Sequence, residues 1–126
     1  MDINQDRVLI VDDDGDSRCI FEEHLSKLGY ATVLAKDGED AMDILSQDPY
    51  FDLIITDVMM PYMTGFDFTT SLKRLASTRS IPIIATSAFH DWKKAREDRE
   101  LIADGFVPKP VERDALAREI KKVLKK

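Results

Sequence analysis

Cysteine is nearly absent from this chain, with Cys19 the single one among 126 residues. One cysteine cannot form an internal disulfide, so the disulfide-stapled scaffolds of small secreted proteins are excluded. A lone thiol fits a reducing compartment, and we expect Cys19 to be a small apolar residue of the core. The cytoplasm is therefore the expected location.

Long apolar runs and an excess of positive charge are missing as well. No stretch approaches the roughly 20 consecutive apolar residues that a membrane-spanning helix needs. The acidic and polar start, MDINQDR, predicts no signal peptide. With 18 Lys and Arg against 24 Asp and Glu, the net charge is -6, so we expect no direct binding to nucleic acid and none to a membrane.

The remaining composition is that of an ordinary globular protein, with 44% hydrophobic and 33% charged residues. A chain of 126 residues can bury a core without staples. No internal repeat, linker or low-complexity segment interrupts it. We therefore expect one domain over residues 1–126.

Short apolar runs bounded by turn residues predict buried strands of a parallel sheet. The expected strands cover residues 7–11, 31–35, 51–57, 81–86 and 106–109. One expected helix ends near Leu28, and a second ends before Pro49. A third follows a Thr64 cap, and the last two cover residues 89–102 and 111–124. Five strands alternating with five helices predict an α/β fold, a doubly wound parallel sheet with the flavodoxin-like strand order 2-1-3-4-5.

Helical spacing predicts which side chains face the core. The first helix should bury a stripe made of Ile20, Phe21, His24, Leu25 and Leu28, with His24 in a structural role. On the third helix, Phe66, Thr69, Leu72 and Leu75 should share one face. The helix over 89–102 has a thin apolar stripe anchored by Trp92, so its docking should be marginal.

Polar residues follow the first, third, fourth and fifth strands, whose carboxyl ends should face one crevice. These residues are Asp12 and Asp13, Asp57, Thr86 or Ser87, and Lys109. Crowded carboxylates repel one another, and a hard cation such as Mg²⁺ resolves the conflict. With a lysine beside them, a carboxylate and a metal can accept a phosphoryl group as an aspartyl-phosphate.

Two other sites compete for the same residues. The run Asp12 to Asp16 with Glu23 suggests an EF-hand, but Ser17 stands where the loop needs glycine and a strand precedes it. A flavodoxin that binds FMN would share the fold. Its phosphate loop should offer hydroxyls and amides, whereas this one offers carboxylates that repel phosphate without a metal.

Four motifs together resemble the receiver domain of two-component response regulators: VLIVDDD over 8–14, Asp57 before Met-Met-Pro, Thr86-Ser87-Ala88, and Lys109-Pro110. The resemblance covers essentially the whole chain. It implies a protein that accepts a phosphoryl group from a sensor histidine kinase or a phosphotransfer protein in a Mg²⁺-dependent reaction, with Mn²⁺ as a substitute.

The resemblance also implies roles for single residues around the metal. Asp57 is the phosphoacceptor and a metal ligand. Asp13 is a direct ligand, Asp12 acts mainly through water, and the backbone carbonyl of Met59 is the third protein ligand.

Three further residues are implied to carry the response. Ser87 turns toward the phosphoryl group, and Phe106 is the aromatic residue whose rotamer follows it. Phe106 replaces the commoner tyrosine, so a switch that uses a phenolic hydroxyl is lost. Lys109 pairs with a phosphoryl oxygen, and Lys109-Pro110 is expected as a cis peptide bond.

The implied output is a change of the surface formed by residues 89–102, 106–109 and 111–124, which would contact a downstream protein or output domain, or a second phosphorylated copy. The protein is expected not to be an enzyme beyond its own phosphorylation and slow autodephosphorylation, since Phe89 and Met59 should obstruct water. Two alternatives are a phosphatase of the haloacid-dehalogenase type, which needs Asp where Met59 stands, and a phosphorylation-independent binding module. A stand-alone regulator is slightly favoured over an excised receiver.

Overall fold

The computed structural model describes residues 6–58, 64–87 and 103–125, and the side chains of residues 65 and 66 are not among those described. Its sheet has five parallel strands in the order β2-β1-β3-β4-β5. The strands are β1 (Arg7–Val11), β2 (Ala31–Ala35), β3 (Leu53–Asp57), β4 (Ile83–Ser87) and β5 (Gly105–Pro108). The helices are α1 (Gly15–Lys27), α2 (Gly38–Gln47), α3 (Gly65–Arg74) and α5 (Arg113–Leu124).

This architecture confirms the expected fold class and strand order. The helix expected over 89–102, together with its Trp92 and Phe89, lies outside the described residues. So does Met59.

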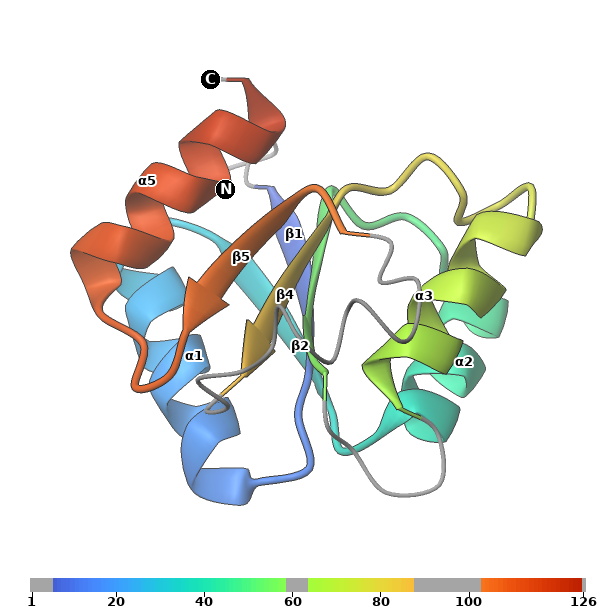
Figure 1. The fold of residues 1–126 in the computed structure, drawn as a ribbon, viewed down its shortest axis with the longest axis horizontal. Helices are drawn as coiled ribbons and strands as arrows, with labels where there is room; N and C mark the ends of the chain where they lie inside the picture. The colour runs from blue at the N-terminus through green and yellow to red at the C-terminus, as the bar shows by residue number, and fades with distance from the viewer. Residues whose placement is uncertain (1–5, 59–63, 88–102, 126) are drawn as a thin grey trace.

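Helices cover both faces of the sheet, with α1 and α5 on one face and α2 and α3 on the other (Figure 1). Successive side chains of a strand point to opposite faces. Along β1, Val8 and Ile10 therefore join the apolar cluster that contains α1 and α5, whereas Leu9 and Val11 join the one that contains α2 and α3. Continuous apolar runs in the sequence thus supply two cores at once.

The strand register brings the functional candidates to one edge. Asp57 lies opposite Thr86 in the β3–β4 ladder, and Ser87 lies opposite Pro108 in the β4–β5 ladder. Asp12 follows the last residue of β1 directly. The carboxyl ends of β1, β3, β4 and β5 therefore meet where the sequence predicted them to meet.

The two helices α2 and α3 each begin after a residue whose side chain caps the helix N-terminus. Asp37 Oδ1 accepts a hydrogen bond from the Asp40 amide at 2.8 Å, and Thr64 Oγ1 accepts one from the Asp67 amide at 3.2 Å. Such caps satisfy amides that the helix itself leaves without acceptors.

Replacing Asp37 with alanine should lower the free energy of unfolding by about 1 kcal/mol, because the Asp40 amide loses its acceptor. Urea unfolding followed by circular dichroism measures the change. Asp43→Ala, at an exposed position of the same helix, is the matched control and should change stability by less than about 0.5 kcal/mol. Equal effects of the two substitutions would contradict a specific capping role.

Three expectations about burial were wrong. Ile20 is 45% exposed and Cys19 is exposed, because α1 turns Phe21 and Leu25 toward the sheet and these two positions away from it. Leu75 is 44% exposed because α3 ends at Arg74 and Leu75 adopts an extended backbone (φ -97, ψ 130). His24 makes a contact that fits the expected structural role: its Nε2 lies 3.3 Å from the Val111 carbonyl oxygen, between α1 and the segment before α5.

Several element boundaries also differ from the expected ones. The strand expected over 81–86 begins at Ile83, after Pro82, which has no N–H to donate. The strand expected over 106–109 is Gly105–Pro108, so Lys109 follows it. The strand expected over 51–57 begins at Leu53, and the helix expected over 111–124 begins at Arg113.

Candidate functional site

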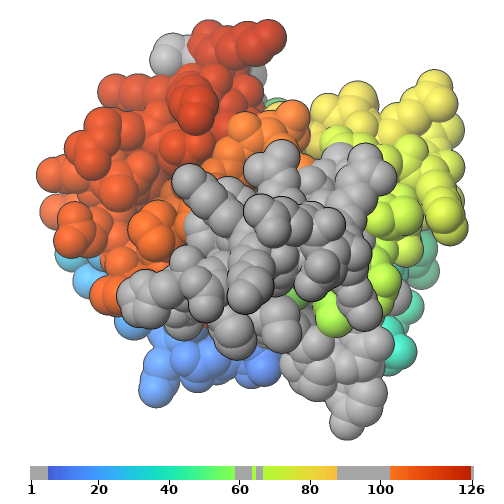
Figure 2. Space-filling model, in the orientation of Figure 1, coloured from blue at the N-terminus to red at the C-terminus, as the bar shows by residue number. Residues whose placement is uncertain are grey.

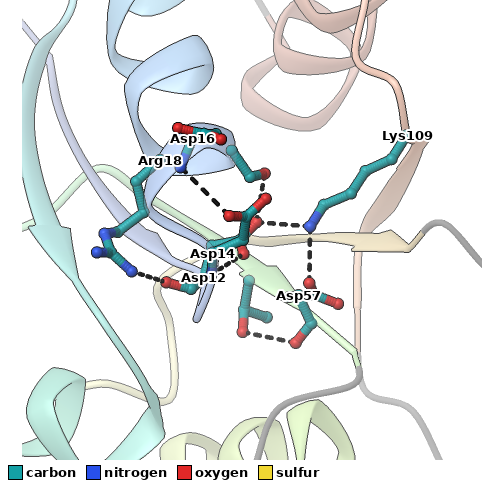
Figure 3. A network of polar contacts seen from close by, with 8 residues as sticks. Asp12, Asp14, Asp16, Arg18, Asp57 and Lys109 are labelled. Carbon is teal, nitrogen blue, oxygen red and sulfur yellow. Dashed lines mark hydrogen bonds and ion pairs between the residues drawn. The ribbon is translucent and has the colours of Figure 1, made fainter.

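One ammonium group bridges two buried carboxylates at the carboxyl edge of the sheet (Figure 3). The Lys109 Nζ lies 2.6 Å from Asp12 Oδ2 and 2.7 Å from Asp57 Oδ2. The side chains of Asp12 and Asp57 are 1% and 10% exposed, and that of Lys109 is 16% exposed. At these distances and burials the two hydrogen-bonded ion pairs are charge-assisted and little screened by solvent.

Two opposing effects act on the pKa of Lys109. Burial lowers the pKa because it disfavours the charged ammonium, but hydrogen bonds from the ammonium to Asp12 and Asp57, and the negative charges of these carboxylates, outweigh burial and raise the pKa above its usual value. Lys109 is therefore a cation at neutral pH.

The carboxylates fit a divalent cation by their number and spacing. One oxygen each from Asp12, Asp13 and Asp57 lies within 4.8 Å of the others, and Asp13 is exposed while the other two are buried. Hard cations such as Mg²⁺ take carboxylate oxygens and keep several waters, which an exposed ligand permits. The structure thus brings the three predicted carboxylates together. Met59, whose backbone carbonyl is the predicted third protein ligand, lies outside the described residues.

The first turn of α1 fixes Asp12 at both its side chain and its backbone. The Asp14 amide donates to Asp12 Oδ1 at 3.0 Å, and the Ser17 hydroxyl donates to Asp12 Oδ2 at 2.7 Å. The Arg18 guanidinium donates to the Asp12 carbonyl oxygen at 2.6 Å. The burial of Asp12 is thus accompanied by donors to each of its oxygens, as a buried charge requires.

Ser17 and Arg18 were not among the predicted site residues. The side chain that caps α1 is Asp14, which accepts a hydrogen bond from the Asp16 amide at 3.3 Å. The sequence held a signal for these residues, because a helix that begins at Gly15, three residues after Asp12, has its first turn close to Asp12.

The predicted switch residues also lie at this edge. Thr86 and Ser87 are 1% and 3% exposed, and Phe106 is half-buried beside Val58 and Ala85. The Lys109 amide donates to the Ser87 carbonyl oxygen at 3.1 Å, which joins the end of β5 to the end of β4. The Lys109-Pro110 peptide bond is cis, as expected.

A groove of about 290 Å³ opens beside Lys109, between the start of α1 and the segment before α5. The groove is lined by the exposed side chain of Ile20 and by Pro110, Val111, Asp14 and Asp16. In the space-filling view, β5 and α5 form one continuous surface, with α1 below it (Figure 2).

Among the described helices, none combines the length and the apolar character that crossing a bilayer requires.

Comparison with known proteins agrees with this geometry. Residues 8–121 match the family described as the response regulator receiver domain. The chain is 36% identical to the probable transcriptional regulator ycf27 of Cyanophora paradoxa, over 100% of this chain and 51% of that protein. It spans about half the length of most of the curated relatives it matches.

Solved structures share the fold over nearly the whole chain. The chemotaxis protein CheY4 of Vibrio cholerae superposes with a TM-score of 0.85 at 30% identity, covering 94% of this chain and 98% of that one. The receiver domain of the sensor histidine kinase PA1611 of Pseudomonas aeruginosa PAO1 superposes with a TM-score of 0.86 at 23% identity, covering 97% and 99%, and that structure has a magnesium ion coordinated in its active-site cleft. The present chain belongs to the response regulator receiver domain family of two-component systems.

Proposed function

We propose that this protein accepts a phosphoryl group on Asp57 from a histidine kinase or a phosphotransfer protein. The observation that carries the proposal is the Lys109 ammonium, held 2.7 Å from Asp57 Oδ2 beside a cluster of three carboxylates. This arrangement supplies a nucleophilic carboxylate, ligands for a divalent cation, and a positive charge for a phosphoryl oxygen.

In the proposed reaction a carboxylate oxygen of Asp57 bonds to the phosphorus of a phosphohistidine. The bond between phosphorus and the imidazole nitrogen breaks, and its electron pair stays with the imidazole, which takes up a proton from solvent. Lys109 then pairs with a phosphoryl oxygen. Positioning and charge neutralisation carry most of such a transfer.

Asp12, Asp13, Asp57 and the backbone carbonyl of Met59 are the residues proposed to hold Mg²⁺, with Mn²⁺ as a proposed substitute. When bound, the cation neutralises the charge that gathers on the phosphoryl oxygens. The spacing of the three carboxylates supports this choice of metal.

The proposed response starts at Ser87, which turns toward the phosphoryl group while Phe106 follows. This repacking would shift the population of conformations of the surface formed by 89–102, β5 and α5, which contacts a downstream protein, an output domain or a second copy. We propose no catalysis of another substrate, and a phosphoryl lifetime lengthened by Phe89 and Met59. A single domain over 1–126 and a cytoplasmic location remain predictions.

Intact mass spectrometry after incubation with acetyl phosphate tests the phosphorylation. We expect one phosphoryl adduct on the wild type with Mg²⁺, none with EDTA, and none on Asp57→Asn, because the amide is not a nucleophilic carboxylate. Asp52→Asn, at an exposed position just before β3, is the matched control and should leave the adduct unchanged.

An adduct that persists in Asp57→Asn would place the acceptor elsewhere and overturn the proposal. A wild type that forms no adduct at saturating Mg²⁺ would favour a module that signals by binding alone. Steady release of phosphate from many turnovers would favour the phosphatase alternative.

A further inference from the structure

Asp12 is the most deeply buried charge of the site, and it depends on few donors. Its side chain is 1% exposed. In the described structure, Asp12 Oδ2 pairs with the Lys109 ammonium and accepts a hydrogen bond from the Ser17 hydroxyl, and Oδ1 accepts one from the Asp14 amide. A buried carboxylate that loses a donor becomes costlier to keep charged and unpaired.

Lys109 cannot make room for a metal cation or pair with a phosphoryl group while it keeps both of its present ion pairs. Its two partners, Asp12 and Asp57, are themselves members of the metal-binding cluster. A cation that enters the cluster competes with the ammonium for the same carboxylates, and a phosphoryl group on Asp57 competes with Asp12 for the ammonium. Release of Lys109 from Asp12 is therefore part of the free energy of both events.

Ser17 is placed to lower the cost of that release. Its hydroxyl donates at 2.7 Å to the oxygen that Lys109 holds at 2.6 Å. It comes from α1, whereas Lys109 follows β5, so the hydroxyl can stay when the ammonium leaves. The amide of Asp14 satisfies the other oxygen and cannot replace it.

We infer that Ser17 is a positioning residue of the phosphorylation site: it keeps Asp12 Oδ2 hydrogen-bonded while Lys109 moves to another partner. Without this hydroxyl, Asp12 holds Lys109 more tightly, and the site binds metal more weakly and accepts a phosphoryl group more slowly. The phosphoryl step of this inference rests on the proposed function, whereas the metal step does not.

Titration calorimetry with Mg²⁺ alone tests the metal step. For Ser17→Ala we expect a dissociation constant about tenfold higher than that of the wild type, the size of one hydrogen bond to a charged group. Ser17→Thr keeps the hydroxyl and should stay within about twofold of the wild type, and Ser17→Val, which has the shape of threonine without the hydroxyl, should behave like alanine. Ser26→Ala, an exposed serine of the same helix, should have no effect.

Three results would overturn the inference: unchanged Mg²⁺ affinity in Ser17→Ala, equal affinities of the threonine and valine variants, or an equal loss in Ser26→Ala. Thermal unfolding in EDTA establishes that each variant is folded. If the alanine variant does not fold, the threonine and valine pair alone decides the role of the hydroxyl.

The rate of adduct formation from acetyl phosphate at saturating Mg²⁺ tests the phosphoryl step. We expect this rate to fall severalfold in Ser17→Ala and to recover in Ser17→Thr. A normal rate in Ser17→Ala would overturn the inference and leave the proposed function intact. No adduct on the wild type would instead overturn the proposed function, and the Mg²⁺ titrations would still decide the role of Ser17 in metal binding.

Discussion

Replacing Lys109 with methionine is expected to lower the free energy of unfolding by about 3 kcal/mol in metal-free buffer at neutral pH, because removing one partner of a buried ion pair leaves the other charge uncompensated. Here two carboxylates lose the same ammonium, since Lys109 Nζ contacts both Asp12 and Asp57. Asp12 is 1% exposed, so water cannot take over that role fully. Urea unfolding in EDTA, followed by circular dichroism, measures the loss.

The matched control is Lys122→Met on α5, whose side chain is 72% exposed and pairs with Glu119 at 3.3 Å. An exposed pair of this kind contributes at most about 1 kcal/mol. A Lys109→Met variant that unfolds at the same urea concentration as the wild type would show that the ammonium does not compensate the negative charges of Asp12 and Asp57.

The same variant should respond more strongly to Mg²⁺ than the wild type does. The carboxylate oxygens within 4.8 Å of one another repel more once Lys109 is gone, and a cation no longer competes with an ammonium for them. Addition of Mg²⁺ should therefore recover a larger part of the stability in Lys109→Met, whereas Lys122→Met should respond as the wild type does.

Replacing Phe68 with alanine is expected to destabilise the fold by about 3–5 kcal/mol, the usual cost of deleting a fully buried aromatic ring. Phe68 is 0% exposed and belongs to the apolar cluster that packs α2 and α3 against the sheet, together with Leu72 and Ile54. The loss combines the transfer of the ring's apolar surface with the cavity left behind. Urea unfolding measures it.

Phe68→Leu is the matched control, because it keeps most of the apolar volume and should cost roughly 1–1.5 kcal/mol. Tyr50→Ala, at a side chain 79% exposed, should change stability by less than about 0.5 kcal/mol. A Phe68→Ala variant within 1 kcal/mol of the wild type would show that the α3 contact contributes little to the core.

Local pattern was enough to predict the elements that the structure describes and the edge of the sheet at which the site lies. Apolar runs that end in Asp12, Asp57 and Lys109 indicate strands buried on both faces, and parallel strands must present their carboxyl ends together. Alternation of strands and helices then left few topologies, and the observed order is the expected one. Because these strand ends meet, the carboxylates and the lysine that follow them indicated a candidate site for a metal cation and a phosphoryl group.

Tertiary structure alone decided which atoms meet and which side chains are covered. Periodicity placed Ile20 on a buried stripe, but how far α1 is rotated against the sheet depends on its contacts with β1 and β2, and this rotation leaves Ile20 45% exposed. Likewise, no pattern states that Ser17 and Lys109 reach the same oxygen of Asp12, because one comes from α1 and the other follows β5. Strand and helix signals arise from neighbours along the chain, whereas the hydrogen-bond partners of a buried carboxylate are set by how distant segments pack.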